Sequence, residues 1–335
     1  MKIEENVPLA QYTTFKIGGP ARFFCSVKSD DDLVQAINFA KDKSLQIFVL
    51  GGGSNVLIRD SGFSGLVIHI EMSGVTFDRE TMIAAAGENW DELVHDTVER
   101  GFYGIENLSA IPGSVGAAPV QNIGAYGAEI ADVLESVRAL DTHDMQFKEL
   151  TKNSCQFSYR TSLFKREKGR YIITSVRLKL NKNGKPNISY KEVGEYLEKN
   201  NIQNPSLKEM RQAVIDIRWN KLPDWKLWGT AGSFFKNPII SADHFDKLKT
   251  KYPGIPGFAE DNGMIKVSLG WILDRICDVK GMCVGNVCTY EKQALVLVAK
   301  PGATSEEVVS LAHKLMNMVK EKTDIEIEGE VEWVN

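Results

Sequence analysis

Two glycine-rich segments constrain the fold of this chain more than any other feature. The first is Gly51-Gly-Gly-Ser-Asn55, which comes directly after the apolar run at residues 47–50. The second covers residues 111–127 and consists largely of small side chains. An apolar run that ends abruptly at glycines predicts a strand followed by a tight turn. Because glycine lacks a Cβ, the main chain of such a turn can lie directly against a ligand.

The backbone N–H groups of both segments are candidates for binding an anion. Ser54 and Asn55 add side-chain donors to the first segment. Two loops of this kind suit a pyrophosphate that carries a nucleoside on each side. Neither loop matches the dinucleotide fingerprint GxGxxG, and the P-loop pattern GxxxxGK[ST] does not occur in the sequence. The simpler alternative is that these glycines only form turns.

Length and charge narrow the class of protein. A chain of 335 residues is too long for one ordinary core, so two or three domains are expected. Its net charge of -4 disfavours nucleic acid as a partner, because phosphate backbones require a basic face. No apolar run reaches membrane-spanning length, and residues 1–10 lack the apolar core of a signal peptide. We therefore expect a cytoplasmic protein with no membrane partner.

The five cysteines are Cys25, Cys155, Cys277, Cys283 and Cys288. Their odd number and the lack of a CxxC pair argue against a disulfide scaffold and fit a reducing cytoplasm. The last three lie close together, which raises the question of a metal site. Their spacing is not that of zinc knuckles, and no histidine accompanies them. We expect buried, inert thiols and no metal.

Helical and extended patterns are mixed along the chain without regular alternation. Ser29, Asn89 and Thr304 are each followed three residues later by an acidic residue, which predicts three capped helices. Residues of about 181–206 are polar and interrupted by glycine and proline, so an excursion or lid is expected there. The mixture favours an α+β fold over a doubly wound sheet. Strands are expected at 47–50, 56–58, 67–70, 83–86, 133–140 and 172–180, and domains at 1–68, 69–214 and 215–335.

Three polar residues stand out as catalytic candidates. Arg160 lies in a polar and aromatic run before a predicted strand. Ser233 follows four small residues at 229–232, which would let a ligand approach its hydroxyl closely. The pattern GxSxG is absent around it and the chain has only five histidines, so a serine-hydrolase triad is poorly supported. Glu330 alternates with Glu326 and Glu328, and the alternative there is a solvated acidic strand edge.

Six motifs occur in order along nearly the whole chain. They are YTTFKIGG at 12–19, GGGSN at 51–55, IPGSVG at 111–116, QNIGAYG at 121–127, YR at 159–160 with SLF at 162–164, and AGSFFKNP at 231–238. Taken together, this set resembles the UDP-N-acetylenolpyruvoylglucosamine reductase family. The resemblance implies a vanillyl-alcohol-oxidase-like FAD-binding fold. Residues 1–68 and 69–214 would form two FAD-binding subdomains, and residues 215–335 an α+β substrate-binding domain.

The resemblance also implies an activity. The chain would be an FAD-dependent oxidoreductase that uses NADPH to reduce UDP-N-acetylglucosamine enolpyruvate to UDP-N-acetylmuramate. That reaction belongs to peptidoglycan synthesis, and so to cell-wall biogenesis, cell shape, the cell cycle and cell division. Tyr190 and the excursion around it are similar to the longer subtype, in which a tyrosine loop closes over the UDP portion. The family often has proline before the catalytic glutamate, whereas this chain has Gly329.

Matching the family motifs residue by residue yields three sets of expected site residues. The catalytic positions are Arg160, Ser233 and Glu330. The FAD positions are Gly51, Gly52, Gly53, Ser54, Asn55, Gly113, Ser114, Gly116, Asn122 and Gly124. The substrate positions are Tyr190, Lys221, Asn237, Lys280 and Gln293.

The expected partner is a small UDP-sugar enolpyruvyl ether, and the expected oligomeric state is a monomer. Two other functions stay open at this stage. An FAD-linked oxidase or dehydrogenase of the same fold would act on another substrate, and its flavin would be reoxidised rapidly by oxygen. A nucleotide-binding module without catalysis would purify colourless.

Overall fold

The computed structural model describes residues 1–334, apart from the side chain of Asp261, and the chain forms two compact units. Residues 8–20 and 54–62, which the sequence placed in the first domain, pack with the C-terminal residues in the second unit. The boundary expected at 215 falls at Lys221, where helix α6 ends. A division of the FAD-binding region at residue 69 stays a prediction. The first unit comprises Met1–Val7, Ala21–Gly53 and Phe63–Asn220, and the second Pro8–Pro20, Ser54–Gly62 and the chain from Lys221 onward.

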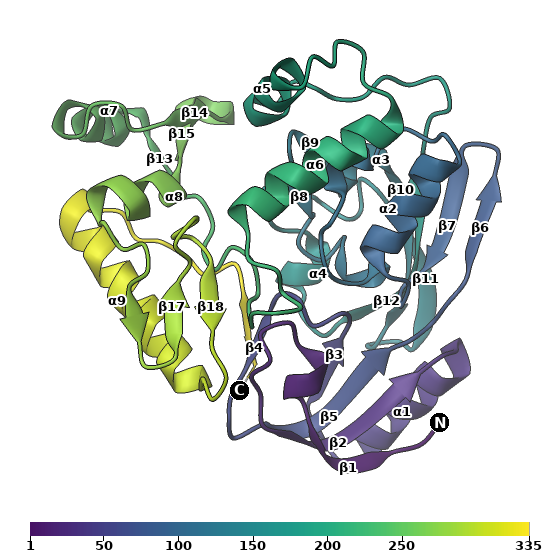
Figure 1. Ribbon diagram of the computed structural model, residues 1–335. Coiled ribbons are helices and arrows are strands. Elements are labelled where there is room, and N and C mark those ends of the chain that lie inside the picture. Colours follow the sequence, from purple (N-terminus) through teal and green to yellow (C-terminus); the bar gives the residue numbers. More distant parts are fainter. Residues whose placement is uncertain (335) are drawn as a thin grey trace. The chain divides into compact units, whose positions relative to one another are not determined.

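A four-stranded sheet in the order β1-β2-β5-β3 contains the strands predicted at 47–50 and 67–70 (Figure 1). Strand β5 pairs in parallel with both β2 and β3, and most of its side chains are buried, as is typical of parallel strands. Helix α1 begins after Ser29, whose hydroxyl accepts the N–H of Asp32, so the predicted cap is confirmed. The bounds are β1 Glu4–Pro8, β2 Pro20–Val27, α1 Asp30–Asp42, β3 Ile47–Leu50 and β5 Phe63–Ile70.

A five-stranded antiparallel sheet in the order β11-β10-β12-β7-β6 forms the rest of the framework of the first unit. In β12 the buried Val176 and Leu178 alternate with the more exposed Arg177 and Lys179, and the strand predicted at 172–180 is confirmed. Asn89 caps α2 by accepting the N–H of Glu92. The bounds are β6 Val75–Asp78, β7 Thr81–Ala85, α2 Trp90–Glu99, β10 Leu134–Asp141, β11 Gln146–Thr151 and β12 Tyr171–Lys179.

The remaining elements of the first unit include those of the second glycine-rich segment, residues 111–127, and of the excursion at about 181–206. Within the predicted excursion, residues 183–189 have no helix or strand, and the helix α5 follows them. Val193 and Leu197 of α5 pack with Met210 and Val214 of α6, which attaches the excursion to the first unit. The bounds are η2 Glu106–Leu108, η3 Val115–Ala117, β8 Gly124–Ala125, β9 Ala128–Glu129, α3 Ile130–Val133, α4 Leu163–Arg166, α5 Lys191–Lys199 and α6 Leu207–Lys221.

The second unit consists of small sheets and the long helix α9. Strand β4 pairs in parallel with β19, while β13-β15-β14 and β16-β17-β18 are antiparallel. Thr304 and Glu307 form the predicted capping box at the start of α9. Among residues 1–334, no helix combines the length and apolar character needed to cross a membrane. The bounds are η1 Ala10–Tyr12, β4 Val56–Ile58, β13 Ile239–Ser241, α7 Ala242–Lys251, β14 Gly257–Ala259, η4 Asp261–Gly263, β15 Met264–Val267, α8 Leu269–Trp271, η5 Ile272–Ile276, β16 Cys283–Val284, β17 Val287–Thr289, β18 Leu297–Ala299, α9 Ser305–Thr323 and β19 Glu332–Val334.

The expectation that Cys277, Cys283 and Cys288 are buried, inert thiols is wrong for two of them. Cys283 and Cys288 face each other across the hairpin of β16 and β17 and form a disulfide. The sequence did not reveal this pair because its five-residue separation makes sense only once a two-residue turn folds the strands together. Two of the three sulfurs considered as metal ligands are therefore bonded to each other. Cys277 remains a buried thiol.

This disulfide predicts a simple count of reactive thiols. Cys25, Cys155 and Cys277 are free and buried, and burial raises the pKa of all three, so the native protein should react slowly with iodoacetamide. In denaturant without reductant, mass spectrometry should find three alkylated cysteines. With reductant it should find five. Five alkylated cysteines without reductant would show that the Cys283–Cys288 bond does not form.

Candidate functional site

The two glycine-rich loops of the sequence meet within the first unit. A Cβ on Gly51 would lie 2.4 Å from the hydroxyl oxygen of Ser114, and a Cβ on Gly52 would lie 2.7 Å from the Cα of Gly113. Real Cβ atoms do not come so close to other atoms. Glycine is therefore required at position 52, where the neighbour is main chain, whereas a Cβ at position 51 would displace the Ser114 hydroxyl. Ser114 is 6% exposed, and no described residue forms a hydrogen bond with its hydroxyl. The junction therefore contains a buried polar group that needs a partner.

Two further residues predicted to bind FAD have visible structural roles. The N–H of Gly116 donates to the carbonyl of Ala86 at 2.8 Å, and a Cβ there would lie 2.6 Å from the Cβ of Ala86. The buried side chain of Asn122 donates to Glu129 at 2.6 Å and accepts the N–H of Ala131 at 3.2 Å. Both residues shape the second loop, so any contact of theirs with a ligand would come through other atoms.

Arg160 lies in a turn that docks on this second loop. Its guanidinium donates to the carbonyl of Gly124 at 2.6 Å, and the Asn122 amide donates to the carbonyl of Ser158 at 3.3 Å. A Cβ on Gly124 would lie 3.1 Å from Nη1 of Arg160, so the guanidinium packs closely against this glycine. Arg160 also has a φ of 53°, a left-handed conformation that non-glycine residues keep only where their surroundings hold it.

Arg218 is a functional candidate that the sequence analysis missed. It lies near the end of α6 and is close enough to Tyr126 and Arg160 to interact electrostatically with both. Burial lowers the pKa of its guanidinium, whereas Tyr126 and Asp91 favour the charged form. Burial also raises the pKa of Tyr126 to about 12, so its hydroxyl stays protonated at neutral pH. A positive charge four residues after the buried Val214, on the apolar face of α6, was the signal in the sequence.

Tyr190 lies against the second glycine-rich loop. Its ring meets that of Tyr126 edge to face, with the centroids 5.4 Å apart. The amide nitrogen of Asn107 donates to the main-chain carbonyls of both Tyr126 and Asn187, at 2.8 Å each. Asn187 in turn donates to the carbonyl of Gly127 at 2.9 Å. The irregular segment before α5 is thus fastened to the loop that also contacts Arg160.

Ser233 lies in an extended segment of the second unit, between two other segments. It forms a β-bridge with Val296, and the N–H of Phe234 donates to the carbonyl of Leu295 at 2.9 Å. On the other side, the N–H of Glu330 donates to the carbonyl of Phe234 at 2.8 Å. Ser233 and Glu330, which are almost a hundred positions apart in the sequence, are therefore brought to adjacent extended segments.

Glu330 differs from the two acidic residues that alternate with it. Glu326 and Glu328 are exposed and pair with lysines, so the solvated acidic edge describes these two positions. Glu330 is only half-exposed, and its main-chain carbonyl accepts the amide of Asn55 at 3.1 Å. This environment separates the catalytic candidate from its neighbours.

The first glycine-rich loop continues from the first unit into the second. Gly51–Gly53 belong to the first unit, whereas Ser54 and Asn55 belong to the second. Asn55 also accepts the N–H of Glu332 at 2.9 Å through its carbonyl. The end of this loop therefore holds the C-terminal motif that carries the glutamate.

Two predicted substrate residues border the short helix α8. Oδ1 of Asn237 accepts the N–H of Leu269, the first residue of α8, at 3.0 Å. A Cβ on Gly270 would lie 2.9 Å from Oε1 of Gln293, so that side chain also lies against α8. Oε1 of Gln293 accepts the N–H of Leu295 at 3.4 Å, in the segment beside the candidate serine. Asn237, Gln293 and this segment thus form one group.

The sequence of this chain resembles those of known proteins over nearly its whole length. A profile described as FAD binding domain matches residues 21–146, and one described as UDP-N-acetylenolpyruvoylglucosamine reductase, C-terminal domain, matches residues 223–334. UDP-N-acetylenolpyruvoylglucosamine reductase of Ralstonia nicotianae is 41% identical over 98% of both chains. That of Cupriavidus pinatubonensis is 42% identical over 97% of both chains. The chain belongs to the UDP-N-acetylenolpyruvoylglucosamine reductase family.

A solved structure of this reductase family supports the same assignment. The crystal structure of UDP-N-acetylenolpyruvylglucosamine reductase from Thermus caldophilus has a TM-score of 0.72 to this chain. The two are 27% identical, and the match covers 100% of each chain. The predicted fold class, an FAD-binding fold followed by an α+β C-terminal domain, is confirmed.

The junction of the two glycine-rich loops fits the FAD of this reductase family. Glycines 51 and 52 let the two loops pack directly against each other, because a Cβ at either position would come too close to the second loop. The buried hydroxyl of Ser114 supplies a donor that no described residue uses. A phosphate or ribose oxygen of the cofactor would satisfy it. The residues that would hold FAD in the first unit are Gly51, Gly52, Gly53, Gly113 and Ser114, with Gly116, Asn122 and Gly124 shaping the loop.

The two lysines expected to bind substrate in this family are placed differently from the other candidates. Lys280 is exposed and pairs with Asp274 at 2.9 Å. Lys221 is half-exposed and is the last residue of α6. Both assignments stay predictions, as do those of Asn237 and Gln293.

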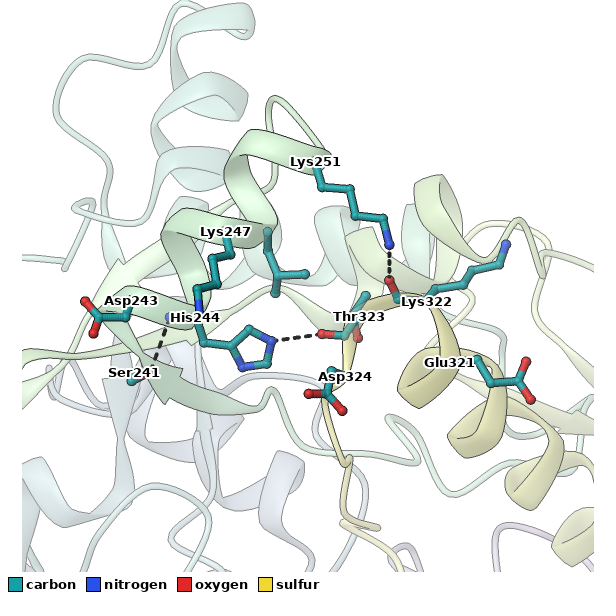
Figure 2. Close-up of a pocket in the computed structure, with 10 residues that line it drawn as sticks. Ser241, Asp243, His244, Lys247, Lys251, Glu321, Lys322, Thr323 and Asp324 are labelled. Carbon is teal, nitrogen blue, oxygen red and sulfur yellow. Dashed lines mark hydrogen bonds between the residues drawn. The ribbon is translucent and has the colours of Figure 1, made fainter.

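A hollow of about 420 Å³ in the second unit is lined by α7 and the end of α9 (Figure 2). His244 contacts the carbonyl of Thr323 at 2.9 Å, and Lys251 donates to that of Lys322 at 3.1 Å. Both side chains thus serve carbonyls at the end of α9, which lack partners within the helix. The hollow is lined by none of the residues expected for the reductase, and these contacts give it a structural role.

Proposed function

We propose that this chain is the NADPH-dependent flavoprotein that reduces UDP-N-acetylglucosamine enolpyruvate to UDP-N-acetylmuramate in peptidoglycan synthesis. The observation that carries the proposal is that both halves of the reductase family match, in order and over nearly the full length. We further propose that the enzyme acts as a monomer in the cytoplasm, where NADPH and nucleotide sugars occur, and that it does not bind nucleic acid.

FAD, when bound, would carry a hydride from NADPH to the methylene carbon of the enolpyruvyl ether. The protein must then stabilise the negative charge that develops towards the substrate carboxylate. Arg160 suits this role because its planar guanidinium offers several donors, and its bond to Gly124 fixes its direction before substrate arrives. Arg218 adds a second positive charge in the same unit.

Ser233 would give the proton to the carbon beside the carboxylate. A serine hydroxyl is a very weak acid, so it can serve only a strongly basic, carbanion-like centre held against it. Glu330, on the adjacent segment, would orient that hydroxyl or share its proton. Asn237, Gln293, Lys221 and Lys280 would hold the remaining oxygens of the substrate, the lysines as point charges.

Anaerobic stopped-flow spectroscopy tests the function directly. NADPH should bleach the yellow colour of the purified protein, and UDP-N-acetylglucosamine enolpyruvate should restore it. Rapid return of the colour with oxygen and none with the enolpyruvyl substrate would favour an FAD-linked oxidase acting on another compound. Colourless protein that binds no FAD would remove the enzymatic proposal.

The substitution Tyr190→Phe should weaken binding of the enolpyruvyl substrate more than it slows reduction of the flavin by NADPH. Tyr190 is 41% exposed, and we propose that its hydroxyl donates to a phosphate of the UDP group. Losing that hydrogen bond should raise the KM for the enolpyruvyl substrate about tenfold, while bleaching by NADPH slows less than twofold. Steady-state and single-turnover kinetics measure the two effects. Equal damage to both half-reactions would indicate a structural role for the hydroxyl.

A further inference from the structure

The segment at residues 183–189 is held to the first unit by few polar contacts. It lacks helix and strand, and its main chain leads directly to Tyr190 and α5. The carbonyl of Asn187 accepts the amide of Asn107, and the Asn187 amide donates to the carbonyl of Gly127. The Asn187 side chain also accepts the N–H of Ser189 at 3.0 Å, which shapes the chain just before Tyr190. We call this set of bonds the asparagine clasp.

Asn107 is built into a rigid part of the fold. It is 1% exposed and lies in the turn η2 between two anchoring bonds. The indole N–H of Trp90 donates to the carbonyl of Leu108 at 3.0 Å, and the hydroxyl of Ser109 donates to that of Glu106 at 2.6 Å. A buried turn fixed in this way can position more mobile segments that bind to it.

The hydrogen bonds of Asn107 explain why an amide stands there. Its nitrogen donates to two carbonyls, those of Tyr126 and Asn187, at 2.8 Å each. No described residue donates to its Oδ1, which is an unfavourable state for a buried acceptor. The two N–H donors of the amide nitrogen, and not its oxygen, are therefore the reason for an asparagine at position 107. They join the glycine-rich loop at Tyr126 to the segment that precedes Tyr190.

We propose that Asn107 is a positioning residue for substrate: it clasps the Tyr190 segment to the glycine-rich loop and so sets the affinity for the nucleotide end. This inference rests on the proposed reductase function. The ring contact between Tyr190 and Tyr126 depends on the two main-chain segments that Asn107 joins. Tyr126 also interacts electrostatically with Arg218, so the ring that contacts Tyr190 lies near this second cation. Releasing the clasp frees the Tyr190 segment without touching the reacting atoms.

The test compares Asn107→Asp and Asn187→Ala in the full-length, FAD-loaded protein. Asn107→Asp keeps the shape but replaces both donors with an acceptor that faces two carbonyls. Asn187→Ala removes a half-exposed side chain and its bond to Gly127. Asn200→Ala is the matched control, because the side chain of that exposed asparagine donates to the carbonyl of Tyr196, four residues earlier, and to no other described residue. Two readouts are used: tryptic cleavage after the exposed Lys182, and the KM for UDP-N-acetylglucosamine enolpyruvate.

Asn107→Asp should raise both the cleavage rate and the KM about tenfold, from the loss of two hydrogen bonds, with bleaching by NADPH changed less than twofold. Asn187→Ala should raise both about threefold. The double variant should be no worse than Asn107→Asp, because both changes open one clasp. Asn200→Ala should match the wild type.

Unchanged cleavage in both variants would overturn the clasp, and faster cleavage with an unchanged KM would overturn its role in binding. If Asn107→Asp fails to fold, Asn187→Ala decides both points alone. Should the wild type not turn over the enolpyruvyl substrate, the proposed function fails. The cleavage assay would still judge whether the clasp exists, so the two failures are distinguishable.

Discussion

Ser233→Ala should leave the protein folded and yellow while nearly abolishing its reoxidation by the enolpyruvyl substrate. The substitution removes one oxygen from a half-exposed side chain whose segment is held by main-chain bonds to its two neighbours. Bleaching by NADPH needs no proton from this residue and should stay near the wild-type rate. Reoxidation should fall on the order of 10²-fold or more, because hydride addition without protonation leaves a carbanion-like species that reverts.

Two further variants sharpen the test of Ser233. Ser233→Cys should keep part of the reoxidation rate, since a thiol can also deliver a proton. Ser310→Ala, on an exposed position of α9, should have no effect and controls for loss of a hydroxyl. Anaerobic single-turnover absorbance separates the two half-reactions. A Ser233→Ala protein that reoxidises at nearly the wild-type rate would mean that water or another residue is the acid.

The helices and strands were predictable because their signals are local. Each of three predicted helix starts depends on a capping residue and an acidic residue three positions later. The structure has α1, α2 and α9 directly after Ser29, Asn89 and Thr304. The alternation in β12 likewise needs only the side chains of that strand. What local patterns do not contain is the partner of each segment, so the entry of 8–20 and 54–62 into the second unit was not predicted.

In the candidate site, too, local motifs predicted individual residues but not the contacts between distant segments. Sequence motifs selected the glycines, Arg160, Ser233 and Glu330, and the structure adds how some of them meet. The contact of Gly51 with Ser114 and the pairing of Glu330 with Phe234 join distant segments, which no spacing in the sequence expresses. Asn107 had no signal at all, because an asparagine in a turn is ordinary and its importance lies in two carbonyls supplied by other loops. Arg218 did carry a signal, a charge on an apolar helix face.

Arg160→Lys should lower the rate of reoxidation by the enolpyruvyl substrate on the order of 10²-fold, with bleaching by NADPH little changed. Lysine keeps the positive charge but not the planar set of donors, and it cannot keep the bond geometry to Gly124 that aims the guanidinium. Stabilisation of charge that appears only in the transition state is lost mainly from the chemical step, so the KM should change much less than kcat.

The control for this change is Arg166→Lys, six positions further on. Arg166 is exposed and bonds to Gln156, so the same substitution there should leave both half-reactions intact. Arg160→Ala should be slower than Arg160→Lys and should recover partly when guanidinium ion is added, because the small cation can occupy the space that the side chain leaves. If Arg160→Lys instead reoxidises within threefold of the wild type, charge alone is sufficient at this position. The second cation, Arg218, would then be the residue to test as the stabiliser of the developing carboxylate charge.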